Sequence, residues 1–354
     1  MEGPSTEPRT GEQRRDRRMK RFTYATALAL ALALAATAPA QTPAPLVAAV
    51  GNNMNHVPSF VGVEKGIFLK YGVDLKLKVL NTGQEMAKAL QAGEVQIIGA
   101  AYSNYPLAVE RGMAARGVVG QVGDRSSRFS DDSVSIWTRK GKGITRVEDL
   151  VGKRVGTPVG GTGDQYLGVV LAKKGIQRAQ LQVLNVPPGN LASTLESGGV
   201  DAVATWEPFG SQIEMRVPDA LLLVRGGGYI GYFINMALAN DLIDKQPELV
   251  ERYVVGMAAA TQYTRKNLDE AAEIATRWIR GLDVAVARKA IRHMAFDARI
   301  TASTRAAWDD NVKVLLEQKK LRAPVPWQQG VEPRFIEKVM KAYPELFADL
   351  KPVP

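Results

Sequence analysis

Short apolar runs alternate with longer segments of helical periodicity from residue 46 onward, an order that predicts an α/β fold with mostly parallel sheets. Residues 73–80 alternate apolar and charged side chains, which is typical of a half-exposed strand. Continuous apolar runs predict further strands at residues 46–50, 95–99, 155–157 and 221–224. Helices are expected at residues 59–71, 83–90, 101–111, 248–266, 268–280, 284–294, 304–318 and 333–343.

A glycine-rich turn at residues 158–163 follows the predicted strand at 155–157 and opens a helix that runs to Lys174. Glycines let backbone N–H groups approach a ligand closely, and free N–H groups at a helix start favour an anion. Thr162 or Asp164 is expected to cap this helix, because either side chain can accept the unpaired N–H groups of its first turn. The spacing matches neither a P-loop nor the dinucleotide pattern. A helix-starting turn without any ligand is the alternative interpretation.

Two short patterns recur in the same order. Lys-Tyr-Gly-Val at residues 70–73 is echoed by Lys-Lys-Gly-Ile at 173–176, and the pattern at 90–96 is echoed at 195–201. The two echoes are offset by 103 and 105 residues. A nearly constant offset indicates that the same strand and helix unit occurs twice.

This duplication predicts two lobes of similar build. We expect the first lobe to comprise residues 45–130 together with 236–354, and the second lobe to comprise residues 131–235. Residues 133–138 and 232–238 are expected to carry the chain between the lobes. Two such crossovers would form a hinge.

Equivalent loops of the two halves follow the carboxyl ends of parallel strands, where open α/β sheets bind ligands. Projecting the glycine turn back by the offset points to residues 53–59, and projecting residues 206–207 back points to residues 101–104. We therefore expect one cleft between the lobes. The candidate contacts with a ligand are Asn53, His56, Ser103, Asn104, Gly160, Gly161, Thr162, Gly163, Asp164, Trp206 and Glu207.

The residue types of these candidates indicate the chemistry of the cleft. Glu207 would need a cation or a hydrogen-bond donor as its partner there, unless it is a carboxylate of the lobe surface. Trp206 would stack on a ligand or fill the core, and His56 would donate to an anion or cap a helix. Since no Arg or Lys is placed in the cleft, we expect a small organic solute with an anionic end at the glycine turn and a donor end at Glu207.

Residues 1–40 have the features of a cleavable signal peptide. Six Arg and Lys residues lie between Arg14 and Arg21, an apolar run follows at 25–36, and Ala38-Pro39-Ala40 fits the cleavage site. The apolar run is too short to span a bilayer. The alternatives are a retained anchor, a partial twin-arginine signal and a start of translation at Met19. Export predicts that the mature protein is periplasmic.

Composition argues against several classes of function. The 354 residues include no Cys and two His, so a thiolate or His-rich metal site is not expected, and we expect no cofactor. The motifs of serine hydrolases and zinc proteases are absent, which argues against an enzyme. The net charge is +10, but the basic residues beyond the N-terminal segment are not clustered with aromatic ones, so nucleic acid is not expected as a partner.

Four segments together resemble the periplasmic substrate-binding proteins of ABC importers, in the branch for nitrate, sulfonates, taurine and thiamine precursors (SsuA/THI5-like). These segments are residues 64–75, 90–95, 149–156 and 200–209. The resemblance implies a type II two-lobed α/β fold with a mostly parallel sheet in each lobe and two crossover strands. Its ligand loops correspond to Asn53 to His56, to Thr82, Gly83 and Gln84, to Ser103 and Asn104, to residues 160–165, and to Trp206 and Glu207.

The resemblance also implies a function. A protein of this kind binds a small solute, is not an enzyme, and delivers the solute to an ABC permease and ATPase in the inner membrane; we expect it to act as a monomer. Two alternatives remain open at this stage. One is an enzyme on the same fold that makes a pyrimidine or menaquinone precursor, and the other is a ligand sensor for a membrane kinase.

Overall fold

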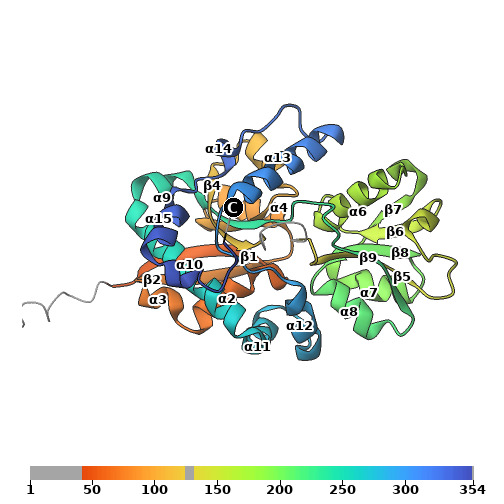
Figure 1. The fold of residues 1–354 in the computed structure, drawn as a ribbon, viewed down its shortest axis with the longest axis horizontal. Helices are drawn as coiled ribbons and strands as arrows, with labels where there is room; N and C mark the ends of the chain where they lie inside the picture. The colour runs from red at the N-terminus through yellow and green to blue at the C-terminus, as the bar shows by residue number, and fades with distance from the viewer. Residues whose placement is uncertain (1–41, 124–130, 353–354) are drawn as a thin grey trace, which may run out of the picture. The chain divides into compact units, whose positions relative to one another are not determined.

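Two five-stranded sheets carry the fold in the computed structural model, which describes residues 42–123 and 131–352 (Figure 1). The first sheet has the order β2 (Val73–Leu80), β1 (Ala44–Gly51), β3 (Ile97–Ala101), β10 (Ile234–Ala239) and β4 (Ala115–Val122). The second has the order β7 (Gln182–Asn185), β6 (Arg154–Thr157), β8 (Ala202–Trp206), β5 (Val134–Arg139) and β9 (Ala220–Arg225). The predicted signal peptide, residues 1–40, lies outside the described residues.

Both sheets have the same mixture of strand directions. In the first, β1 pairs in parallel with β2 and β3, and β10 lies antiparallel between β3 and β4. In the second, β6 pairs in parallel with β7 and β8, and β5 lies antiparallel between β8 and β9. Each sheet is therefore mostly parallel with one antiparallel strand in fourth place. This confirms the predicted α/β fold class and the duplicated layout.

Helices cover both sheets, and we call each sheet with the helices packed on it a lobe. The second lobe contains α6 (Thr162–Lys173), α7 (Leu191–Glu196) and α8 (Phe209–Arg216), with α6 on one face of its sheet and α7 and α8 on the other (Figure 1). The first lobe contains α2 (Val57–Glu64), α3 (Ile67–Lys70), α4 (Gly83–Gln91), α5 (Tyr105–Glu110), α9 (Asn240–Lys245), α10 (Pro247–Lys266), α11 (Leu268–Trp278), α12 (Val284–Ala290), α13 (Ala302–Glu317), α14 (Trp327–Gly330) and α15 (Arg334–Ala342). None of the helices in the described residues is long and apolar enough to cross a membrane.

The two segments predicted to carry the chain between the lobes are strands. Residues 133–138 fall almost entirely in β5, and residues 232–238 fall largely in β10. Each is the antiparallel strand of its own sheet, because the chain enters that sheet from the other lobe. The chain that passes from β9 back to β10 is therefore residues 226–233, which we call the return crossover.

One predicted helix is divided in the structure and one strand was not predicted, each for a local reason. Residues 59–71 form two helices, α2 and α3, because Gly66 adopts the left-handed conformation at φ 62° between them. Strand β4 was missed because glycines are depleted in strands. Gly117 of β4 is needed there, since a Cβ would collide with the side chain of Asn235 on β10.

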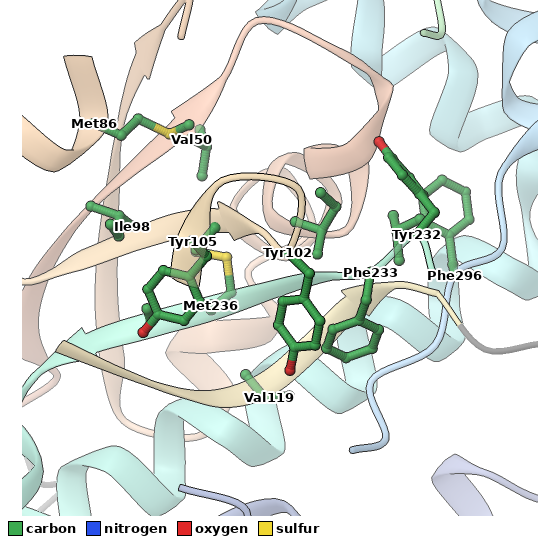
Figure 2. Packing of buried hydrophobic residues seen from close by; sticks show 14 of the residues in the cluster. Val50, Met86, Ile98, Tyr102, Tyr105, Val119, Tyr232, Phe233, Met236 and Phe296 are labelled. Atoms are coloured by element: carbon green, nitrogen blue, oxygen red, sulfur yellow. The ribbon is translucent and has the colours of Figure 1, made fainter. Parts of the chain in front are cut away.

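An aromatic cluster fixes the loop that follows β3. The Tyr102 ring lies beside the Phe233 ring (Figure 2), with 4.8 Å between the ring centroids. It also meets the Trp308 ring edge-on at 5.3 Å. The N–H of Tyr102 also donates to the carbonyl of Phe233 at 3.0 Å. Tyr102 is fully buried, so the loop carrying Ser103 is anchored to the end of the return crossover.

Candidate functional site

Loops at the strand ends of the two lobes meet directly. Ser103, after β3, and Thr162, at the start of α6, share a hydrogen bond of 2.9 Å between their hydroxyl oxygens. The side-chain nitrogen of Gln84 lies 4.0 Å from the point where a Cβ on Gly160 would stand. Asn104 contacts Gly83 in the same way at 3.4 Å, so the first-lobe loops after β2 and β3 gather opposite the glycine turn.

The glycine turn carries its own carboxylate. Gly161, and not Thr162 or Asp164, occupies the N-cap position of α6 and makes no side-chain cap. Asp164 accepts the N–H of Gly160 at 2.9 Å and forms an ion pair with Arg178 at 2.6 Å. Because Asp164 is 4% exposed and lies in the first turn of the helix, it interacts favourably with the helix dipole that was expected to attract a ligand anion.

Two glycines of the turn allow close packing at two places. One lets α6 approach β8, and the other lets the Trp206 ring approach the turn. A Cβ on Gly163 would stand 2.7 Å from the carbonyl oxygen of Ala204, so this glycine allows α6 to approach β8. A Cβ on Gly161 would stand 3.4 Å from the Trp206 ring. Trp206 is half-buried and meets Phe209 edge-on at 5.9 Å. It therefore lines the strand-end edge of the second lobe beside the turn.

Glu207 does not require a ligand as its partner. Its side chain is fully buried, accepts the N–H of Ser211 at 3.0 Å and pairs with the guanidinium of Arg225 at 2.6 Å. Burial raises the pKa of Glu207, and the charge and hydrogen bond of Arg225 lower it. The prediction that Glu207 binds a donor or amine of the solute is corrected, because its negative charge is balanced within the second lobe.

His56 follows the carboxyl end of β1, but it is buried and its side-chain partner, Gln121, lies within the first lobe. It is 3% exposed and lies against β1 and β3, where a Cβ on Gly99 would collide with its ring and a Cβ on Gly51 would stand 3.0 Å away. Its Nδ1 lies 3.0 Å from Oε1 of Gln121, and Gln121 donates to Ser59. Burial lowers the pKa of His56 to about 4, against a smaller rise from Gln121, so the ring is neutral at physiological pH.

Asn53 and Thr82 have local structural roles. Asn53 accepts the N–H of Asn55 at 3.1 Å at the N-cap of a short 3-10 helix, and Thr82 accepts the N–H of Glu85 at 3.2 Å at the N-cap of α4. Asn104 occupies the N-cap position of α5 without a side-chain cap. The structure thus places Gln84, Ser103, Asn104, Gly160, Gly161 and Thr162 together, with Trp206 beside them.

Sequence reasoning missed the polar roles of Asp131, Tyr232 and Asn311 around the return crossover. Asp131 is buried and accepts the N–H groups of Gly228, Tyr229 and Ile230 at 3.0, 2.8 and 3.3 Å. The hydroxyl of Tyr232 donates to Asn55 at 2.8 Å, and Gln165 donates to Asn311 at 2.7 Å. The run Gly226-Gly-Gly228 could have suggested backbone amides in need of an acceptor. Nothing local pointed to Asn311, which lies 146 residues from Gln165.

Replacing Asp131 by asparagine should lower the free energy of unfolding by about 1–3 kcal/mol, measured by urea denaturation. The amide would present an N–H₂ group where the carboxylate oxygens now accept three N–H groups. Asp241→Asn is the control, because the Asp241 side chain is 83% exposed and its loss should change the value by less than about 0.5 kcal/mol. Equal stability of the two variants would contradict this role of Asp131.

The described residues contain no group of three or more His, Asp or Glu side chains that could hold a metal ion.

Comparison with known protein families identifies the family of this chain. Residues 53–271 match the family model described as NMT1/THI5 like. The chain belongs to this family. The predicted resemblance is thereby confirmed.

Individual relatives are binding proteins at low identity. A protein of Brucella abortus (strain 2308), described as a candidate binding protein, is 26% identical over 225 residues, which cover 62% of this chain and 66% of the relative, just under two thirds of its length. The taurine-binding periplasmic protein of Escherichia coli (strain K12) is 25% identical over 192 residues, covering 54% of this chain and 58% of that protein.

Solved structures share the fold. The alkanesulfonate-binding protein SsuA from Xanthomonas axonopodis pv. citri, bound to MOPS, superposes with a TM-score of 0.70 at 20% identity, over 82% of this chain and 99% of that one. The periplasmic nitrate-binding protein NrtA from Synechocystis PCC 6803 gives a TM-score of 0.69 at 13% identity, over 89% and 92%. The fold is therefore that of the type II periplasmic binding proteins.

Proposed function

We propose that this protein is the exported solute-binding component of an ABC importer. It captures a small organic anion or zwitterion, of the sulfonate or taurine class, between its two lobes in the periplasm and delivers it to a permease and ATPase in the inner membrane. It acts as a monomer without catalysis. The observation that carries the proposal is the direct meeting of Ser103 and Thr162, which brings the strand-end loops of the two lobes face to face.

Membership of the NMT1/THI5-like family supports this proposal. Relatives named for taurine and alkanesulfonates favour a sulfonate over other small solutes. The lobes that would close on the solute are residues 45–130 with 236–354 and residues 131–235. Residues 1–40 would direct export and be cleaved.

The proposed solute contacts come from both lobes. Gln84, Ser103 and Asn104 offer neutral donors from the first lobe, and the glycine turn with Thr162 offers a hydroxyl and backbone N–H groups from the second. A few placed polar groups beside an aromatic surface are typical of sites for small ligands. Trp206 supplies that surface. Since Glu207 is paired with Arg225, orientation of the solute depends on these neutral groups.

Thermal-shift measurements on residues 41–354 test the proposal. Taurine, longer alkanesulfonates, nitrate and pyrimidines would each be added at increasing concentration, and the true solute should raise the melting temperature. A solute at one hundred times its Kd stabilises the folded state by about 2.7 kcal/mol. Thr162→Val should reduce this shift at a given concentration. Thr276→Val, whose exposed hydroxyl donates to Glu273 within α11, is the control. A flat response to every solute would contradict the proposal.

A further inference from the structure

A second polar connection between the lobes is centred on Asn311 of α13. This residue is 2% exposed. Its Oδ1 accepts a hydrogen bond from Gln165 of α6 at 2.7 Å, and its Nδ2 donates to the carbonyl of Gly231 at 2.9 Å. One first-lobe side chain therefore bonds to the second lobe and to the return crossover at once.

The return crossover changes partners midway along its length. Up to Ile230, its backbone is held by Asp131 of the second lobe, and Tyr166 of α6 donates to the carbonyl of Gly226 at 2.6 Å. From Gly231 onward it is held by the first lobe, where a Cβ on Gly231 would stand 2.6 Å from that of Ala307. The bond that marks this change is the one from Asn311, so Asn311 lies at the point where the lobes would pivot.

The contact between α6 and α13 is bordered by open space. A cavity of about 810 Å³ separates much of α6 from α13, and the return crossover forms part of its wall. Its lining includes Val169, Ala172, Ile230, Ala307, Asn311 and Val314. Asn311 is among these lining residues, so open space borders its bond to Gln165.

We propose that Asn311 and Gln165 form a latch that holds the lobes together, and that Asn311 thereby sets solute affinity without touching the solute. The latch rests on the proposed function, because closure governs affinity only if the lobes grip a solute. The ion pair of Lys289 with Glu214 also joins α12 to α8 at 2.6 Å, but its side chains are 38% and 37% exposed. Exposed ion pairs contribute little to stability and are screened by salt, whereas the buried hydrogen bond between two neutral amides is not screened by salt.

Measured distances between the lobes, without any solute, test the latch. The chain has no Cys, so Leu69→Cys in α3 and Leu184→Cys in β7 can carry spin labels at positions that are 52% and 41% exposed. Asn311→Ala and Gln165→Ala should each shift the distribution toward the separated state, changing the ratio of closed to open molecules by roughly 3- to 10-fold. The double variant should shift it little further, because either single change already removes the shared bond.

Asn267→Ala is the matched control. Asn311 donates to the carbonyl of Ala307, four residues earlier, at 2.6 Å. Asn267 makes the same kind of bond, to the carbonyl of Tyr263 at 2.9 Å, and both of these residues belong to the first lobe. The distance distribution of Asn267→Ala should equal that of the parent. Distributions in Asn311→Ala and Gln165→Ala that coincide with the parent would overturn the latch, whatever the solute screen finds. Shifted distances together with a screen that finds no solute would instead uphold the latch and count against the proposed function.

Discussion

Replacing Arg225 by methionine should lower the free energy of unfolding by about 3–5 kcal/mol, the largest effect we expect from a single change. The methionine removes the guanidinium that lies 2.6 Å from Glu207. Of the two partners of that fully buried carboxylate described above, the N–H of Ser211 remains. Arg225 also lies over the Trp137 ring at 5.8 Å, so its packing is lost as well. Urea denaturation at pH 7 measures the change.

The loss of unfolding free energy in Arg225→Met should depend on pH in a defined direction. Without Arg225, the pKa of Glu207 rises further above its ordinary value of 4.5, because burial is no longer opposed. The folded state then binds the proton more tightly than the unfolded chain, so stability is retained below about pH 4.5 and falls as the pH rises through the raised pKa. The deficit of Arg225→Met should therefore shrink on acidification.

Two further variants make this prediction specific. Replacing both partners, Glu207→Leu with Arg225→Met, removes the buried charge together with its partner, so the double variant should be more stable than Arg225→Met alone. Arg292→Met removes an exposed ion pair with Asp269, whose partners are 63% and 67% exposed, and should cost less than about 1 kcal/mol. A double variant less stable than the single one would contradict the account of Glu207 as a buried charge balanced by Arg225.

The duplicated layout could be predicted because the periodicity of apolar residues and two recurring sequence patterns are visible in short stretches of the chain. Strand β2 was predicted with its observed bounds, since its alternation of apolar and charged residues reflects one buried and one exposed face. The repeat placed Ser103 opposite the glycine turn without any knowledge of the tertiary structure. That prediction succeeded because equivalent strands of a repeated unit end at equivalent edges of their sheets.

The partners of the site residues could not be predicted, because they come from distant segments. The sequence predicts Glu207 as a ligand-binding carboxylate in the cleft. Glu207 follows β8, and its partner Arg225 lies on β9, which is separated from β8 by β5 in the sheet. The position of His56 depends on glycines at 51 and 99 in two different strands. A strand glycine alone suggests close approach of some group but does not say which one.

Acidification should destabilise the protein through His56 by up to about 3 kcal/mol. Burial lowers the pKa of His56 from 6.5 to about 4. Between these pH values His56 is therefore protonated in the unfolded chain but stays neutral in the folded state. The stabilising effect is complete above pH 6.5 and is lost as the pH falls toward 4. His56→Gln should remove this component, so its unfolding free energy should vary less between pH 7 and pH 4 than that of the parent.

The other histidine, His293, supplies the control for the slope of unfolding free energy against pH. Burial, with a contribution from the charge of Arg225, lowers the pKa of His293 to about 4 as well, but this ring is only half-buried and solvent screens its charge. His293→Gln should therefore flatten the pH profile less than His56→Gln does. The slope is the decisive measurement, because His56→Gln also loses packing against Gly51 and Gly99 and so starts from a lower stability at pH 7. An unchanged slope in His56→Gln would show that this ring is not held neutral in the folded state.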